Sequence, residues 1–248
     1  MSRGARIAEE LWGSGPGGTR VFERADVERL PAPARLYMEH AIAPGTPLAN
    51  AVRLRLRGEI KLRRWLPFTA EQVVHRVHGF IWRASARMNG LAIRGFDRLV
   101  DGEGEMQWKL LGLFPVMTAS GPDISRSAAG RFVTESAWLP SMFCSDAVSW
   151  TAEGQVVAVA HVNVFGEPAH FAITVDEIGR AMSVKLARWG QPGGGGLPLR
   201  RLWRHRRGGT NLHRLHRAQP HPCRLAFRNQ AFRTRRRILP RDGRGSRV

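Results

Sequence analysis

The chain has 248 residues, of which 43% are hydrophobic, and this composition excludes a wholly disordered protein. Its net charge of +19 is typical of proteins that bind nucleic acid or an anionic membrane surface. Sixteen of the 39 basic residues but only one of the 20 acidic residues lie in residues 197–248, which leaves residues 1–196 with a net charge of +4. The basic character therefore belongs to the tail, and the body of the protein is nearly neutral.

Residues 1–24 include a Gly/Pro-rich stretch, and we expect a flexible N-terminal segment there. This segment lacks the apolar core of a signal peptide, and no apolar run in the chain reaches the roughly 18 residues of a transmembrane helix. The two cysteines form neither a disulfide framework nor a Cys-x-x-Cys metal pair, which suits a reducing compartment. These features predict a cytoplasmic protein. Residues 25–30 and 34–42 then fit two short helices bounded by prolines.

The clearest strand covers residues 52–62, because apolar and charged residues alternate there with a period of two. Val52, Leu54 and Leu56 fall on one face, whereas Arg53, Arg55 and Arg57 fall on the other. Residues 68–77 fit either a helix or a strand. Further strands are predicted over residues 80–88, 91–100, 105–120, 147–151, 155–165, 169–175 and 181–189. Residues 101–104, with the sequence Asp-Gly-Glu-Gly, are typical of a hairpin turn.

One long helix is predicted over residues 123–139, with Asp123 as its N-cap and Pro140 ending it. Its apolar positions recur at helical spacing: Ile124, Ala128, Phe132 and Trp138. Many strands joined by tight turns and interrupted by one helix predict a mainly β, α+β fold. We expect a curved, half-barrel-like antiparallel sheet with this helix on its concave face, formed by a single β-rich domain over residues 25–192.

Residues 193–248 look unlike the rest of the chain, with a Gly linker followed by 16 arginines, no lysine and no glutamate. Arginine-rich sequence without lysine is what a GC-rich gene yields when it is read in the wrong frame. We therefore predict that residues 197–248 are an out-of-frame reading, irregular in structure, and that an edge of the sheet is left open. If the tail is genuine, its charge favours nonspecific nucleic-acid binding instead.

Several segments of the body are similar to a family of uncharacterised bacterial proteins, a domain of unknown function. They are LPAPARLYMEHAIAPGTPL, RLRLRGEIKL followed by RWLPFTAEQV, GFIWRASAR, VDGEGEMQWKLLGLFPVMTASGPDISRSAAGRFVTESAWLPSMF and VKLARWGQP, all between residues 30 and 192. A one-base shift of the tail permits a reading that resembles the usual ending of this family. The resemblance implies no activity. The strand-rich layout with an inserted helix is similar, at the level of the fold alone, to lipoprotein-sorting half-barrels.

Polar candidates for chemistry are few, and we predict no catalytic residue, metal site or cofactor. His75 and His78 have the spacing of neighbours on a helix but lack a third ligand, and His161 and His170 flank a hairpin where they can face each other. The acids around residues 97–105 and the Arg53/Arg55/Arg57 stripe fit a turn and the wet face of a sheet.

Aromatic residues give the best functional indication, because seven of the eight tryptophans precede the tail. They fit either an ordinary core or an apolar cavity between sheet and helix that binds an apolar small molecule, a lipid or a partner segment. The predicted lining is Phe80, Trp82, Trp108, Phe114, Phe132 and Trp138. The alternative is a hydrolase-like enzyme that uses polar residues at the same cavity, such as Asp97, Glu135 or His161.

Overall fold

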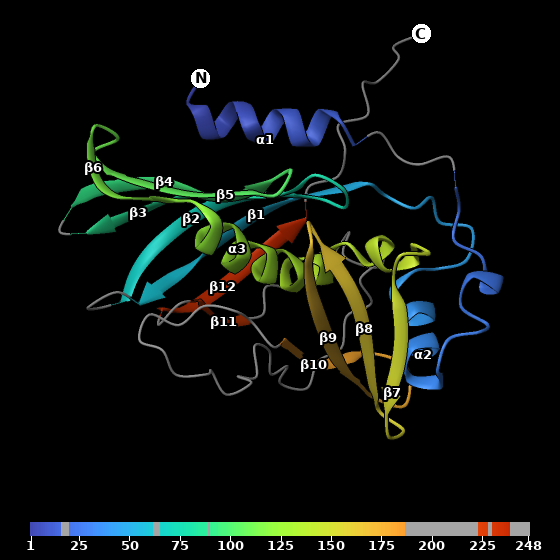
Figure 1. The fold of residues 1–248 in the computed structure, drawn as a ribbon. Coiled ribbons are helices and arrows are strands. Elements are labelled where there is room, and N and C mark those ends of the chain that lie inside the picture. The colour runs from blue at the N-terminus through green and yellow to red at the C-terminus, as the bar shows by residue number, and fades with distance from the viewer. Residues whose placement is uncertain (16–19, 62–64, 89, 187–222, 228–229, 239–248) are drawn as a thin grey trace, which may run out of the picture.

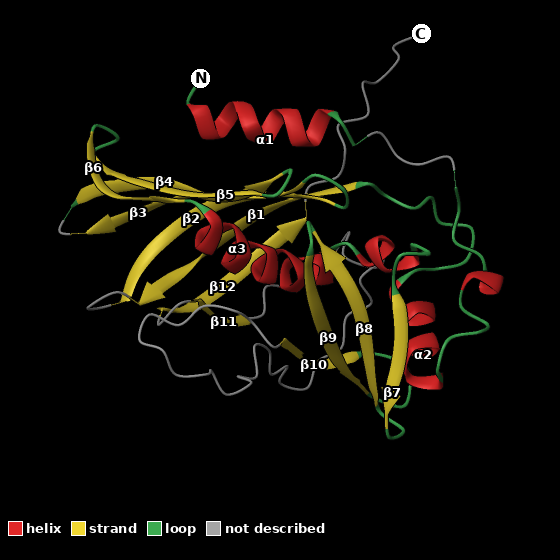
Figure 2. Ribbon diagram, in the orientation of Figure 1, coloured by secondary structure: helices red, strands yellow, loops and turns green. Residues whose placement is uncertain are grey.

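The computed structural model describes residues 1–15, 20–61, 65–88, 90–186, 223–227 and 230–238. For residues 60–61 and for the strands after residue 222, only the backbone is described. Two antiparallel sheets with a helix between them make up most of the described chain (Figures 1 and 2). The expected mainly β class is therefore confirmed, although the strands divide between two sheets where one was expected.

The larger sheet has eight strands in the order β11-β12-β1-β2-β3-β4-β5-β6, all antiparallel to their neighbours. Their bounds are β1 Ala51–Lys61, β2 Trp65–His75, β3 Gly79–Met88, β4 Leu91–Val100, β5 Glu103–Leu110, β6 Phe114–Ser120, β11 Cys223–Phe227 and β12 Gln230–Ile238. Strands β1 to β6 form a meander of hairpins. Among the described strands, β6 and β11 each have one neighbour, so the sheet is open. Residues 68–75, which fitted either a helix or a strand, belong to β2.

The smaller sheet has four strands in the order β10-β9-β8-β7. Their bounds are β7 Ser149–Glu153, β8 Val157–Val164, β9 Glu167–Val175 and β10 Ala181–Leu186. Helix α2 (Ala32–Ala41) packs against β7, β8 and β9, close to the expected second short helix. The first short helix is a single 3-10 turn, Arg24–Asp26.

Helix α3 (Pro122–Glu135) is the long helix of the sequence, and it contacts both sheets. It lies between them in Figure 1, beneath the concave face of the larger sheet. Gly121 is the N-cap, and the expected N-cap Asp123 instead lies in the first turn. Its carboxylate interacts favourably there with the positive end of the helix dipole. The helix ends at Glu135, and its predicted last turn is instead the 3-10 turn Ser136–Trp138. Pro140 begins a second 3-10 turn, Pro140–Cys144.

The expected register of β1 is confirmed. Leu54 and Leu56 are buried in the core that faces α3, whereas Arg55 and Arg57 are exposed on the opposite face. Each strand of β1 to β4 repeats this division, so that one face of the larger sheet joins the core with α3 and the smaller sheet.

Helix α1 (Arg3–Gly13) covers part of the other face, which corrects the expected flexible segment over residues 1–24. Its buried side chains Ile7, Ala8 and Leu11 pack on Val73, Ile81 and Phe96 in a second, smaller core. Ile7 and Leu11 are four residues apart, so they face the sheet from successive turns of the helix. The Gly/Pro-rich stretch that follows led us to predict a flexible segment instead.

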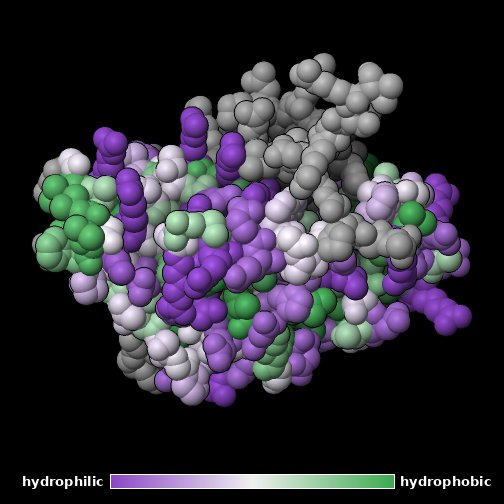
Figure 3. All heavy atoms as spheres, turned by 90° about the horizontal axis from the view of Figure 1, so that it is seen from above, coloured by the Kyte–Doolittle hydropathy of each residue, from purple (hydrophilic) through white to green (hydrophobic). Residues whose placement is uncertain are grey.

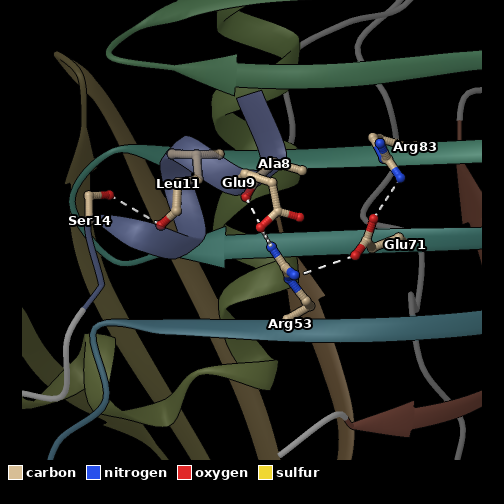
Figure 4. A network of polar contacts seen from close by, with 7 residues as sticks. All are labelled: Ala8, Glu9, Leu11, Ser14, Arg53, Glu71 and Arg83. Atoms are coloured by element: carbon tan, nitrogen blue, oxygen red, sulfur yellow. Dashed lines mark hydrogen bonds and ion pairs between the residues drawn. The ribbon is translucent and has the colours of Figure 1, made fainter. Parts of the chain in front are cut away.

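A polar network holds α1 to the sheet (Figure 4). Arg53 of β1 forms an ion pair with Glu9 at 2.8 Å and lies 3.7 Å from Glu71 of β2, which pairs in turn with Arg83 of β3 at 2.7 Å. The Arg53 guanidinium also lies 5.0 Å from the centre of the Trp12 ring. The charged face expected to be wet is therefore partly covered by this helix.

The tail also differs from the expected irregular structure. Strand β12 pairs with β1 and β11 pairs with β12, so β1 is not an open edge. The backbone N–H and C=O groups of arginine can pair in a β-sheet like those of other residues, so the composition of the tail did not exclude strands. Residues 187–222 and 239–248, with the Gly linker, lie outside the described residues, and the out-of-frame reading stays a prediction.

Glycine at position 104 sets the distance between α3 and β5. A Cβ atom there would lie 2.6 Å from the Cα of Ser125, and the Gly104 N–H donates to the Ser125 hydroxyl at 2.8 Å. Only a residue without a side chain allows the helix to approach the strand this closely.

We expect Gly104→Ala to destabilise the protein by about 1–3 kcal/mol, because the methyl group meets backbone that cannot move freely. Urea unfolding monitored by circular dichroism measures the change. Gly13→Ala is the matched control, since nothing lies within 4 Å of that position. Equal stability of the two variants would contradict this account of the α3–β5 contact.

Candidate functional site

Arg131 of α3 occupies the centre of the concave face, and its side chain is only 9% exposed. Its Nη1 donates to Asp97 Oδ2 of β4 at 2.7 Å, and its Nε lies 3.5 Å from Glu135 Oε1, one helical turn further on. Glu135 is buried as well. The group is therefore a buried cation between two carboxylates, where each charge depends on the others because water is excluded.

Aromatic rings enclose this guanidinium. It lies 4.9 Å from the centre of the Phe80 ring and 5.2 Å from that of Trp82, at distances suited to cation–π attraction. Phe80 stacks on Phe132 at 6.4 Å, and Trp82 contacts Trp108 at 5.7 Å. We call Arg131, Asp97, Glu135 and these four rings the guanidinium cluster.

Local sequence explains how the strands deliver these groups. Trp82, Asp97 and Met106 are cross-strand neighbours in the register of β3, β4 and β5. A Cβ atom at Gly95 would lie 2.5 Å from the Trp108 ring, so the glycine makes room for the indole. The indole Nε1 then donates to Asp97 Oδ1 at 3.0 Å, and both oxygens of that carboxylate are used.

Gln72 extends the same row on β2, opposite Trp82. It is 1% exposed, and within the described part of the chain its Nε2 has no hydrogen-bond partner. An unsatisfied buried amide group costs about 1–3 kcal/mol. The concave face is therefore more polar than an apolar cavity would be.

Four of the six predicted cavity residues meet in this cluster: Phe80, Trp82, Trp108 and Phe132. Trp138 is half-buried and packs against the main core from the first 3-10 turn after α3. Phe114, by contrast, is 62% exposed at the far end of the larger sheet. Sequence reasoning found the aromatic members but missed Arg131, because a buried arginine has the same letter as a solvated one.

The acids expected around one turn are divided by the structure. Asp97 faces the concave side, whereas Glu105 faces α1 and pairs with Arg98 at 2.8 Å and with Arg3 at 2.5 Å. Asp101 and Gly102 have the positive φ values of 49° and 86° that a tight hairpin turn requires. Asp97 and Glu135 are both engaged by Arg131, so this arrangement offers a structural clamp for α3.

We expect Arg131→Met to destabilise the protein by about 3–5 kcal/mol, because the buried Glu135 and the largely covered Asp97 would be left without a cation. Adding Asp97→Asn and Glu135→Gln should recover part of that loss. Arg6→Met is the control, since the Arg6–Glu10 pair is 3.8 Å long and exposed, and such pairs contribute about 0–1 kcal/mol. Urea unfolding decides, and a loss in the triple variant as large as in Arg131→Met would refute the charge explanation.

Exposed apolar side chains gather at one end of the larger sheet, at the turns β3–β4 and β5–β6. We call these residues the apolar end: Met88, Leu91, Leu111, Leu113, Phe114, Val116 and Met117. The group is continuous, because Met88 pairs with Leu91 and the Leu111 N–H donates to the Ala92 carbonyl at 2.7 Å. Figure 3 shows it as a green area at the end where these turns lie.

The sequence held a signal for the apolar end. Residues 110–117 read LLGLFPVM, in which apolar residues surround the turn without the alternation of a half-buried strand. In the structure, Leu113 is 73% exposed and every residue from 111 to 118 is exposed. Large contiguous patches of exposed apolar residues are features of protein or membrane interaction sites.

His75 ends β2 and His78 lies in the turn that follows, so they are not on a helix as the spacing suggested. Their ring centres are 4.7 Å apart. His75 Nδ1 accepts from the backbone N–H groups of Val77 and His78, both at 3.2 Å. This pair fits a structural turn, and among the described residues no cluster of three metal-ligating side chains occurs.

Acidification should therefore destabilise the fold through His75. Burial, and secondly the neighbouring His78, lowers the pKa of His75 from its ordinary value of 6.5, so the folded protein favours the neutral ring. This contribution is intact above the unfolded-state pKa and is lost as the pH falls through the folded-state pKa. Between about pH 7 and about pH 5, the free energy of unfolding should fall less in His75→Gln than in the unmodified chain. Identical slopes would argue against it.

His161 and His170 face each other across the β8–β9 hairpin, as expected, with their Nδ1 atoms 2.7 Å apart. His161 Nε2 is 2.7 Å from the Thr151 hydroxyl. The close Nδ1–Nδ1 contact requires that one ring donates and the other accepts. His161 is thus part of an exposed pair on the smaller sheet, whereas the guanidinium cluster is formed by α3 and the larger sheet.

A hollow of about 450 Å³ lies between the 3-10 turn Arg24–Asp26 and the segment before β7. Arg20 crosses it, binding Asp26 at 2.5 Å and the Cys144 carbonyl at 3.2 Å. Burial raises the pKa of the Cys144 thiol to about 11, so the thiol is protonated at neutral pH and is a poor nucleophile.

The fold and these sites define a mainly β protein with a buried guanidinium cluster and one exposed apolar end. Residues 20–210 match a Family of unknown function (DUF6544), and the chain belongs to that family. The resemblance seen in the sequence is thereby confirmed, and the match ends within the arginine-rich tail. Comparison with curated proteins and with solved structures found no match, so the likeness to lipoprotein-sorting half-barrels stays a prediction.

Across the described residues, no helix has both the length and the apolar character needed to cross a bilayer.

Proposed function

We propose that this protein is a non-catalytic binding protein that docks on an apolar partner surface through the apolar end. The observation that carries the proposal is the exposure of Leu113 and Phe114, at 73% and 62%, within a continuous apolar group. Burying a side chain of this size in a partner contributes about 1.5–3 kcal/mol each. A few such residues together are enough for a specific complex.

In this proposal the guanidinium cluster is the scaffold. Phe80 and Phe132 are almost fully buried, and their rings stack on each other. Asp97 and Glu135, which the alternative of a hydrolase-like enzyme would require as catalytic groups, form ion pairs with Arg131. Of the predicted lining residues, Phe114 is the one placed to touch a partner directly.

The proposed compartment is the cytoplasm. The single cysteine with a described side chain, Cys144, is a free thiol. A chain without a disulfide framework suits a reducing environment. Exposed apolar residues there need a partner or a membrane to cover them, because they otherwise favour aggregation.

We expect the double variant Leu113→Ser and Phe114→Ser to lose most of the retention on phenyl-agarose and most of the bis-ANS fluorescence of the unmodified chain. Ile178→Ser is the matched control, because Ile178 is 58% exposed but lies alone in the β9–β10 turn. Both variants should unfold at the same urea concentration as the unmodified chain, since exposed side chains add little to stability. Equal loss of retention in the control would refute the apolar end as the docking surface.

A further inference from the structure

We propose that the surface on which the apolar end docks is an anionic membrane, with its residues inserted among the lipids and nearby cations at the phosphates. This inference rests on the proposed function and names its partner. Insertion of apolar side chains and attraction of basic side chains are together the usual way that a protein without a spanning helix binds a bilayer surface.

Four basic side chains lie on one face of the sheet beside the apolar end: Arg57, Arg87, Arg94 and Lys109. Arg94 pairs with Lys109 across β4 and β5, and the same cross-strand row runs through Ser85 and Thr69 to Arg57. Arg87 lies one residue before Met88, opposite Ala92. Figure 3, which looks onto this face, shows hydrophilic side chains projecting next to the apolar area.

These four cations differ from the arginines further along the same face. Arg53, Arg83 and Arg98 each form an ion pair with a glutamate. No ion pair is formed by any of the four in the part of the chain whose side chains are described. Two glutamates lie one position further along the same face, Glu59 on β1 and Glu71 on β2, and Glu71 is paired with Arg83. The excess positive charge is therefore available to an external anion.

The two features occupy adjacent positions, as a membrane requires. The β5–β6 turn at residues 111–113 and the exposed residues Met88 and Leu91 lie at this end of the sheet, and Arg87 and Lys109 are within two residues of them along the strands. When the turns pass the headgroups, the long basic side chains can reach the phosphates from the same face. Nucleic acid would use the cations but not the leucine, valine and methionine side chains, because these cannot stack on bases.

The test uses the full chain and two kinds of vesicle, phosphatidylcholine alone and phosphatidylcholine mixed with phosphatidylglycerol. We expect Arg87→Gln with Arg94→Gln to weaken sedimentation with the anionic vesicles at low salt, by about fivefold for each charge removed. Arg29→Gln with Arg35→Gln is the matched control, because both arginines are exposed away from the sheet end. Equal weakening by the two pairs would overturn the role of the four cations.

The arginine-rich tail can also attract anionic lipid, so insertion is read separately. A chain with Cys144→Ser and Cys223→Ser carries an environment-sensitive NBD label on Leu113→Cys or, as the control, on Ile178→Cys. Anionic vesicles should shift the emission of the label at 113 to the blue and protect it from dithionite, without effect at 178. Tail-driven adsorption would leave both labels unchanged and overturn the membrane inference.

The outcomes separate this inference from the proposed function. If the label at 113 stays in water on every vesicle while bis-ANS binding still depends on Leu113 and Phe114, the apolar end docks on a protein and the membrane inference is wrong. If bis-ANS binding is also independent of both residues, the proposed function fails as well. Insertion at 113 that requires Arg87 and Arg94 supports both.

Discussion

The burial of Arg131 is the constraint on which the concave side of the protein depends. A guanidinium held in a low-dielectric core must be matched by acceptors, and Asp97 supplies one from the sheet while Glu135 supplies another from the helix itself. Since Asp97 is fixed in the β4 ladder, the ion pair determines where along the sheet α3 can lie. Hydrophobic packing alone would tolerate several positions of the helix, because it has no direction.

Two of the segments that carry the family resemblance contribute to this contact. In VDGEGEMQW, Gly102 makes the turn, Gly104 admits the helix and Trp108 binds Asp97. In SGPDISRSAAGRFVTES, Gly121 caps α3 and Arg131 completes the cluster. These two stretches therefore position α3 on the sheet, a structural role that is independent of any activity.

The alternating strands were predictable because period-two patterns such as Arg53 to Arg57 report a real two-faced environment, and only Arg53 differs because α1 covers it. The helix α1 was missed because its neighbours in sequence break helices, and the second sheet because alternation shows faces but not partners. The aromatic members of the cluster could be listed from composition, but their polar centre could not, since burial of Arg131 and Gln72 arises only when strands and helix are assembled. Phe114 was assigned to the interior for the same reason: its hydrophobicity fits a core, whereas its place beside a turn decides its exposure.

The face of the larger sheet that carries α1 has two regions, one in which the arginines are paired and one in which they are not. Beneath α1, every arginine whose partners are described above is matched by a glutamate, because the helix excludes water and an unmatched charge there would be costly. Towards the apolar end no helix of the described residues covers this face, and Arg57, Arg87 and Arg94 are exposed, so a missing counter-charge costs little while the end is free. The same absence of cover leaves Leu113 and Phe114 in water, which is unfavourable. Docking on an anionic membrane would bury these apolar side chains and pair the unmatched cations with lipid phosphates. A single binding mode therefore accounts for both features of this end.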